Sequence, residues 1–155
     1  MLGGVRIPSR LGLAGHSDAD VLLHALTDAL LGSLALPDIG TLFPDTDPKW
    51  KDAASGPLLA GAYAMVKTQG YQVVNADCTL VCDKPRLQPY YSSMRNEIAG
   101  ILNVSPGRIG LKAKTTEGTQ LALKRKSIAA MAVVLVERES GVRTSDLGAR
   151  RSELR

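Results

Sequence analysis

The chain of 155 residues suits a single globular domain, and its 45% content of hydrophobic residues is enough for a core. The formal net charge of +4 is compatible with an anionic ligand such as phosphate, but only 4% of the residues are aromatic, which argues against nucleic-acid binding by base stacking. No apolar run approaches the length of a membrane span, and the first residues, MLGGVRIPSR, lack the apolar centre of a secretory signal, so we expect no membrane contact and no targeting segment in this chain.

Hydrophobic periodicity predicts helices that alternate with strands. A short strand is predicted at 5–8, followed by a helix from Ser17 to about Leu34 with Ser17 or Asp18 as its cap. The later predicted elements, in chain order, are a loop at 37–52, a helix at 56–69, a strand at 71–82, a helix at 90–103, a strand at 108–117 and a well-buried strand at 127–137.

This alternation indicates an α+β or mixed α/β fold, with helices layered on one face of a mostly antiparallel or mixed sheet. Residues 1–139 are predicted to form the domain, and the charged segment 140–155 is expected to be a disordered or loosely attached tail. Cys78 and Cys82 lie four apart on a predicted strand, on the same side, and are predicted to be buried thiols. Too few further ligands lie near them for zinc, and a reducing compartment is the default.

The predicted first helix carries polar residues at helical spacing. Asp20, His24 and Asp28 stand at i, i+4 and i+8, so they lie along one side. Carboxylates that flank an imidazole are typical of metal-binding histidines, although a solvent-facing polar stripe has the same spacing. His16 and Ser17 precede the helix, where backbone N–H groups favour an anion such as phosphate; an ordinary capping loop is the alternative.

Two polar loops are further candidates. The first carries Asp38, Asp45 and Asp47 and is suited to the hydroxyls of a sugar or polyol, or to a divalent cation, while turn chemistry alone also explains these residues. The second, KAKTTEG at 112–118, offers lysines and hydroxyls for phosphate and Glu117 for a divalent cation; a charged strand end is its alternative reading.

Three sequence blocks together resemble the 2-C-methyl-D-erythritol 2,4-cyclodiphosphate synthase family. They are H-S-D-x-D-x-x-x-H at 16–24, D-I-G-x-x-F-P-D-x-D-P at 38–48 and KAKTTE at 112–117. The segments LPDIG, DPKWK, LKAKT and KSIAA look closest to plant and algal members. The resemblance implies a lyase of the non-mevalonate isoprenoid pathway that converts 4-CDP-2-C-methyl-D-erythritol 2-phosphate to the cyclic 2,4-diphosphate and CMP. It also implies a homotrimer with active sites between subunits, and a plastid location for a plant or algal protein or a cytoplasmic one for a bacterial protein.

The resemblance also implies two metal sites. His24 would be a ligand of zinc, and Glu117 would bind a second divalent cation, magnesium or manganese. From the helix spacing, Asp20 and Asp28 are expected to orient His24.

For the reaction itself, the resemblance implies that His16 and Thr115 are catalytic and stabilise phosphate charge. The stretch 82–88 would supply a backbone cradle for the cytidine. The implied substrate-binding residues are Ser17, Asp38, Ile39, Gly40, Phe43, Pro44, Asp45, Thr46, Asp47, Cys82, Asp83, Lys84, Pro85, Arg86, Lys114, Thr116 and Lys124.

The chain departs from the family pattern in two places. The family's G-x-D-x-H motif provides two further zinc ligands, and nothing before His16 in this chain is an Asp or a His. We therefore expect weak zinc binding, slow or no turnover and a less stable, N-terminally truncated domain. A truncated homologue that binds nucleotide or isoprenoid diphosphate without turnover is the alternative. Where bacterial members have L-G-F-x-G-R the chain has GTQLALKRK. Lys124 falls at the position of the motif's arginine and would meet a phosphate as a point charge, without the bidentate contact of a guanidinium.

Overall fold

The structure, a computed structural model, describes residues 1–8, 18–50, 53–117 and 127–139. Its elements in chain order are helices α1 (Val21–Gly32), α2 (Ile39–Leu42) and α3 (Ser55–Thr68), strand β1 (Tyr71–Val81), the 3-10 turn η1 (Gln88–Tyr90), helix α4 (Tyr91–Ile101), the 3-10 turn η2 (Pro106–Arg108) and strands β2 (Ile109–Lys114) and β3 (Ala129–Arg138). The predicted tail 140–155 lies outside the described residues.

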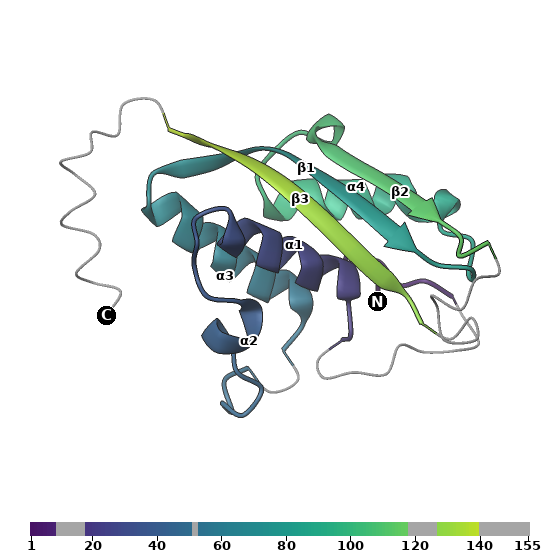
Figure 1. The fold of residues 1–155 in the computed structure, drawn as a ribbon, viewed down its shortest axis with the longest axis horizontal. Coiled ribbons are helices and arrows are strands. Elements are labelled where there is room, and N and C mark those ends of the chain that lie inside the picture. Colours follow the sequence, from purple (N-terminus) through teal and green to yellow (C-terminus); the bar gives the residue numbers. More distant parts are fainter. Residues whose placement is uncertain (9–17, 51–52, 118–126, 140–155) are drawn as a thin grey trace.

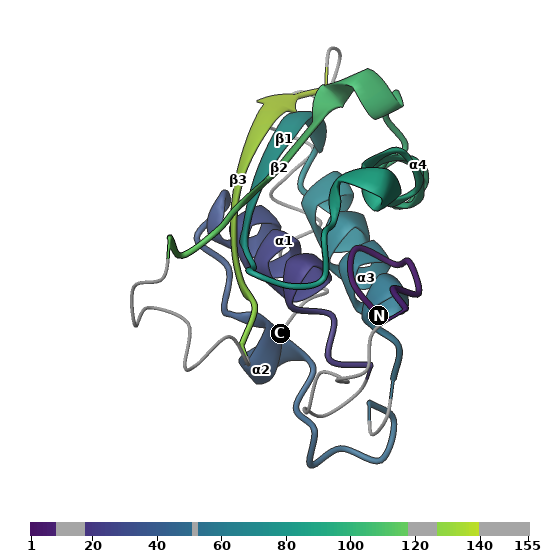
Figure 2. The same cartoon turned by 90° about the vertical axis from the view of Figure 1, so that its right-hand side faces the viewer.

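The three described strands form one mixed sheet in the order β2-β1-β3. β1 runs parallel to β2 and antiparallel to β3, so that Cys78 lies between Leu111 and Ala132. The parallel pair is joined by the crossover helix α4, as parallel strands require. Helices α1, α3 and α4 all lie on one face of the sheet (Figures 1 and 2). The prediction of helices layered on one face of a mixed sheet is confirmed.

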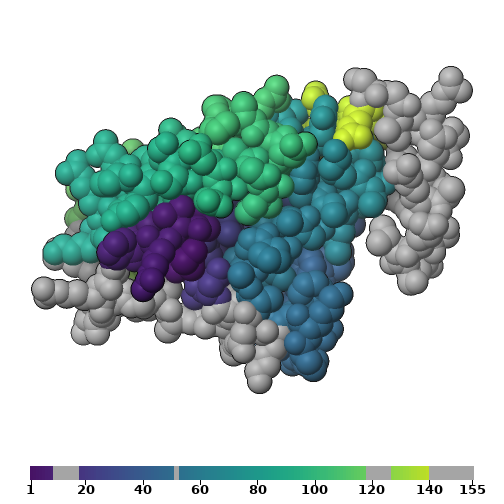
Figure 3. All heavy atoms as spheres, turned by 180° about the vertical axis from the view of Figure 1, so that it is seen from behind, coloured from purple at the N-terminus to yellow at the C-terminus, as the bar shows by residue number. Residues whose placement is uncertain are grey.

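The core lies between this sheet and its helix layer. α1 is almost wholly apolar and is buried on several sides, because β1, β3 and α3 all contact it. Its buried leucines are Leu22, Leu23, Leu26, Leu30 and Leu31. Burying a leucine side chain contributes about 1.5–3 kcal/mol, so α1 is a main source of stability. The N-terminal residues 1–8 close the layer between α3 and α4 on the helical side of the molecule (Figure 3).

α1 begins later than predicted, and its cap differs. Asp20 is the N-cap, and its Oδ1 accepts hydrogen bonds from the N–H groups of Leu22 at 3.2 Å and Leu23 at 3.1 Å. The same carboxylate accepts from Gly3 N–H at 2.8 Å and Gly4 N–H at 2.7 Å. Both glycines have positive φ, +57° and +75°, which glycine adopts without strain. The predicted cap at Ser17 or Asp18 is wrong, because Asp20 serves the helix and the N-terminal turn together.

Three further predictions differ from the structure. The strand at 5–8 is not formed, and only an isolated bridge pairs Leu2 with Val5. The loop at 37–52 contains the short helix α2. The last strand is not well buried: its side chains alternate between partly buried and exposed, and Met131, Val133 and Leu135 are 59%, 71% and 55% exposed. Within the described ranges, no helix is long and apolar enough to cross a membrane.

Candidate active site

A buried serine, Ser55, links two residues of the first motif, Asp18 and His24. Ser55, at the start of α3, has no exposed surface, and its Oγ lies 2.5 Å from Asp18 Oδ1 and 3.1 Å from His24 Nε2. The Ser55 N–H also donates to Asp18 Oδ2 at 3.3 Å. The α1–α3 packing thus brings together residues that are 31 and 37 positions apart in sequence.

These contacts fix which imidazole nitrogen donates. A carboxylate only accepts, so the single hydroxyl proton of Ser55 goes to Asp18. Ser55 Oγ is then an acceptor for an N–H on His24 Nε2. A neutral imidazole in this arrangement keeps its lone pair on Nδ1, which is the nitrogen that can bind a cation or accept a proton.

The carboxylates predicted to orient His24 have other partners. Asp20 is buried and caps α1, with Gly3 and Gly4 as further donors. Asp28 Oδ1 accepts from Ile39 N–H at 2.9 Å and so anchors the following loop on α1. In this structure the contact to His24 comes from Ser55, which is in turn hydrogen-bonded to Asp18. The role of Asp20 and Asp28 in orienting His24 stays a prediction. A serine before an apolar run normally indicates a helix cap, so this contact could not be predicted from the sequence.

The loop after α1 divides into anchoring and exposed residues. Asp38 caps α2 by accepting from Thr41 N–H at 2.8 Å, and hydrogen bonding from Thr41 lowers the pKa of the Asp38 carboxyl. Asp47 Oδ1 accepts from Lys49 N–H at 2.9 Å. Phe43 is buried and packs edge-on against Trp50, with 4.9 Å between ring centroids. All of the predicted substrate residues of this loop except Phe43 are exposed or half-exposed, namely Asp38, Ile39, Gly40, Pro44, Asp45, Thr46 and Asp47.

A pocket of about 580 Å³ lies where β1 and β2 end side by side. The parallel pairing brings the predicted segment 82–86 against the predicted residues Lys114 and Thr115. Lys84 and Pro85 are joined by a cis peptide bond. The lining residues are Cys82, Asp83, Pro85, Arg86, Leu87, Gln88, Tyr91, Lys112, Ala113, Lys114 and Thr115. Sequence reasoning did not place Tyr91 here, since it belongs to α4 and reaches the pocket only through the crossover.

The two loops that line this pocket are joined to each other by hydrogen bonds. The Cys82 N–H donates to the Lys114 carbonyl at 2.9 Å. Thr116, which is 6% exposed, donates from its N–H to Asp83 Oδ1 at 2.8 Å, and its hydroxyl lies 2.8 Å from Oδ2. Thr115 Oγ1 donates to the Glu117 carboxylate. The residues predicted to hold phosphate therefore sit on a turn that is hydrogen-bonded to the predicted cytidine loop.

Both cysteines are buried, as predicted. Burial is the main cause that raises the pKa of the Cys78 thiol to about 12; the Asp77 carboxylate adds to this increase and Lys112 opposes it. Burial also raises the pKa of Cys82, whose Sγ lies 3.1 Å from the Lys84 carbonyl oxygen. Neither thiol is set up as a nucleophile or a metal ligand, because both keep their protons.

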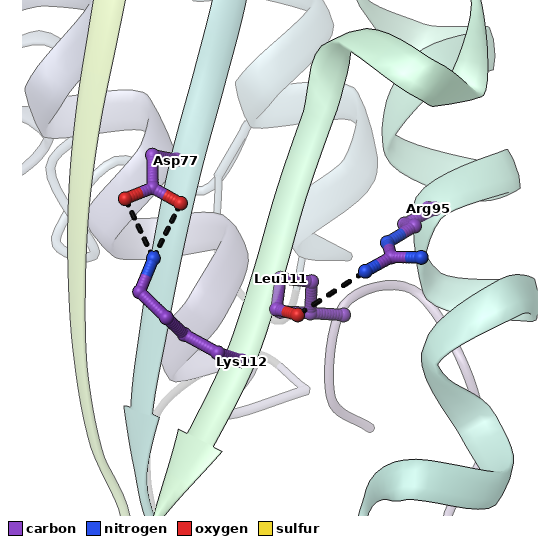
Figure 4. Close-up of polar contacts among 4 residues, drawn as sticks. All are labelled: Asp77, Arg95, Leu111 and Lys112. Carbon is purple, nitrogen blue, oxygen red and sulfur yellow. Dashed lines mark hydrogen bonds and ion pairs between the residues drawn. The ribbon is translucent and has the colours of Figure 1, made fainter.

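The outer side of the sheet carries an ion pair. Lys112 Nζ lies 2.5 Å and 2.6 Å from the two carboxylate oxygens of Asp77, and both side chains are about half exposed. Figure 4 shows these two side chains pointing toward each other, with Arg95 reaching from α4 to the Leu111 carbonyl. Opposite Asp77 stands Gly110, where a Cβ would lie 2.5 Å from Asp77 Oδ1. The pair therefore needs a glycine on β2.

Among the described residues, no group of three His, Cys, Asp or Glu side chains could hold a metal ion. His24 and Glu117 are both described, but each is a single donor, and they do not fit a zinc or magnesium centre by themselves. The predicted residues His16, Ser17 and Lys124 lie outside the described residues.

Comparison with known proteins identifies relatives over most of the chain. A model described as the YgbB family matches residues 1–137. The 2-C-methyl-D-erythritol 2,4-cyclodiphosphate synthase of Moorella thermoacetica is 54% identical over 142 residues, which cover 91% of this chain and 87% of that protein. The protein of the same name from Geobacillus kaustophilus is 50% identical over 138 residues, 89% of this chain and 87% of that protein. A solved structure described as this synthase in a CDP-bound form gives a TM-score of 0.82 at 40% identity and covers 88% of this chain and 89% of that chain. This chain therefore belongs to the YgbB family.

Proposed function

We propose that the chain is a subunit of a 2-C-methyl-D-erythritol 2,4-cyclodiphosphate synthase. In this reaction an oxygen of the 2-phosphate forms a bond to the β-phosphorus of the CDP group. The bond from that phosphorus to the oxygen bridging it to the α-phosphorus breaks, and CMP leaves with the oxygen. Relatives with this name share about half of their residues with the chain, and a structure of the same name was solved with CDP.

The pocket at the ends of β1 and β2 is the observation that carries the proposal. Its volume of about 580 Å³ suits a small-molecule ligand. Arg86 and Lys114 place positive charge around it, and Thr115 adds a hydroxyl, whereas the Lys112 ammonium is paired with Asp77. Phosphoryl transfer depends on positioning and charge neutralisation, which such a lining supplies. We assign the backbone of residues 82–88 to the cytidine, and the side chains of Thr115 and Lys114 to the diphosphate.

We propose that the first motif forms the other side of the site. His24, held by Ser55 with Nδ1 free to accept, is the described residue that can bind a cation or proton near the methylerythritol phosphate. His16 and Ser17 are proposed to neutralise phosphate charge beside it, and the loop at 38–47 to contact the hydroxyls. The carboxylates of Asp38 and Asp28 accept hydrogen bonds from backbone N–H groups of that loop and so hold it in place.

The described donor residues do not complete a metal site. A lone His24 cannot hold zinc tightly, and a lone Glu117 cannot hold magnesium or manganese without oxygen atoms from the substrate. We expect the purified chain to contain well under one zinc ion per subunit after dialysis, measured by inductively coupled plasma mass spectrometry. About one tightly held zinc per subunit would contradict this expectation.

Assembly is the second part of the proposal. The outer face of β3 exposes Met131, Val133 and Leu135 next to one another on alternate positions. An apolar patch of this kind on a sheet face is typical of an interface. We propose that identical copies cover it in a homotrimer, which would place neighbouring subunits beside the pocket.

The test is turnover of the proposed substrate. Purified chain is incubated with 4-CDP-2-C-methyl-D-erythritol 2-phosphate, zinc and magnesium, and CMP and the cyclic diphosphate are followed by chromatography and ³¹P NMR. Lys114→Ala should lower kcat/KM at least about tenfold, the scale of one lost charge-assisted contact in a site of this kind. Lys67→Ala is the matched control, because Lys67 lies on α3 and pairs with Glu139.

A non-catalytic homologue is the competing function, and the absent metal group among the described residues favours it. Calorimetry separates the two: CDP binding without release of CMP from the full substrate supports the binding protein. The two relatives named above are bacterial, which gives no support to the plant or algal likeness or to a plastid location.

A further inference from the structure

We propose that Asp83 is a positioning residue that holds the phosphate side of the pocket through Thr116. The inference rests on the proposed function for the identity of the ligand. Asp83 lines the pocket two residues beyond the end of β1. Its role differs from the substrate contact predicted for it, because its carboxylate is engaged with protein.

The contact joins two loops that are 33 residues apart in sequence. Asp83 Oδ1 accepts from Thr116 N–H at 2.8 Å and from Thr116 Oγ1 at 3.0 Å, and Oδ2 accepts from the same hydroxyl at 2.8 Å. Thr116 is only 6% exposed. Hydrogen bonds to a carboxylate are stronger than those between neutral groups, so this three-contact arrangement fixes both the backbone and the side chain of Thr116.

The turn that is fixed carries the proposed phosphate contacts. Thr115 precedes Thr116 and lines the pocket, and Glu117 follows it. Glu117 has φ of +50°, a conformation that residues other than glycine rarely adopt. Its carboxylate reaches back to Thr115 Oγ1. Thr116 lies between Thr115 and Glu117. Because Thr116 is fixed, the exposed side chains of its two neighbours stay on one oriented turn at the pocket.

Charge explains why Asp83 acts through another residue. A carboxylate facing a diphosphate would repel it, which opposes binding in a pocket lined by Arg86 and Lys114. The Asp83 carboxylate instead accepts hydrogen bonds from Thr116, so its oxygens face protein donors. A second tie, from Cys82 N–H to the Lys114 carbonyl at 2.9 Å, keeps the strands in register without Asp83. Loss of Asp83 should therefore loosen the phosphate turn and leave the cytidine side in place.

The experiment compares Asp83→Ala, Asp83→Asn and the control Glu97→Ala, an exposed carboxylate on α4. We expect Asp83→Ala to weaken CDP binding about tenfold in calorimetry and to lower kcat about tenfold, because the phosphate groups lose an oriented turn. Cytidine binding should stay within about twofold of wild type, and Asp83→Asn, which keeps an acceptor oxygen, should recover to within about threefold. Thr116→Val combined with Asp83→Ala should add little to Asp83→Ala alone.

Hydrogen exchange gives a readout that needs no ligand. In Asp83→Ala the Thr116 amide should exchange faster, while amides of β1 and α1 keep wild-type rates. Unchanged exchange at Thr116 together with unchanged CDP affinity would overturn the proposal, as would equal losses of CDP and cytidine binding. If the wild type releases no CMP, the proposed function fails, whereas the exchange at Thr116 and the ratio of CDP to cytidine affinity still decide the role of Asp83.

Discussion

The two faces of the sheet are built from similar residues but have different surroundings. On the inner face, Ala76, Cys78 and Leu80 of β1 are at most 1% exposed beneath the helices. On the outer face, Met131 and Val133 of β3 are more than half exposed. Val133 stands directly opposite Asp77, the neighbour of a fully buried cysteine. Apolar side chains on a strand thus show that the strand is to be covered, but not whether the cover belongs to the same chain.

The inner face should be the more sensitive to truncation. Leu80→Ala removes a fully buried side chain below the helix layer, and we expect the free energy of unfolding to fall by about 2–5 kcal/mol in urea denaturation. Asn75→Ala, on the exposed side of the same strand, should change it by less than about 0.5 kcal/mol. Equal losses of unfolding free energy in the two variants would show that the two faces of β1 do not differ in burial in solution.

The outer face should control association instead of folding. Val133→Asp places a charge in the proposed interface, and we expect the association constant to fall at least about a hundredfold, or about 2.7 kcal/mol, because a buried unpaired carboxylate is costly. Sedimentation velocity measures the change, and circular dichroism should be unaltered. Glu137→Ala, farther along β3, is the control. A wild-type chain that stays monomeric at every concentration removes the basis of the comparison.

The buried thiol on the inner face predicts a pH dependence. The folded pKa of Cys78 is about 12, above its ordinary value of 9.0, so the folded thiol keeps a proton that the unfolded thiol releases. Its stabilising contribution is complete below pH 9 and is lost as the pH rises from 9 to 12. At pH 10 the loss should be on the order of 1 kcal/mol. Cys78→Ala should lack this part of the slope in unfolding measured from pH 8 to 11; identical slopes would contradict burial as the cause.

The smallest effect belongs to the ion pair on the outer face. Asp77 and Lys112 are about half exposed, so Asp77→Asn should cost less than about 1 kcal/mol. High salt should abolish the difference, since exposed charges are screened. Thermal unfolding at about 20 mM and about 1 M NaCl measures it, because the Debye length falls to about 3 Å at the higher salt concentration. A loss that persists at high salt would mean that neighbouring chains bury the pair.

Strong periodicity explains which elements could be predicted. α3, β1 and α4 lie within about two residues of the predicted ranges, since long apolar patterns set them. The start of α1 could not be predicted, because the donors that select Asp20 as the cap include the N–H groups of Gly3 and Gly4. The exposure of β3 was missed for another reason: AAMAVVLVER is apolar on both faces, so its pattern does not say which one the chain covers.

The sequence predicted which segments form the candidate site, but not which of their side chains contact one another. Family resemblance placed 82–86 and 114–116 in one site, and the parallel pairing of β1 with β2 brings them together. The support of His24 by Ser55 depends on how α1 packs on α3, and the Asp83–Thr116 tie depends on strand register. Neither relation leaves a spacing signal in the sequence.

Gly110 has a consequence for how this sequence can vary. Even a methyl group there would meet the Asp77 carboxylate, whose partner is Lys112. An alanine at Gly110 is therefore compatible with the fold only if the Asp77 side chain is shortened or shifts, which would disturb its pairing with Lys112. The three positions, on two strands, should accordingly change together among relatives, as a single unit of substitution.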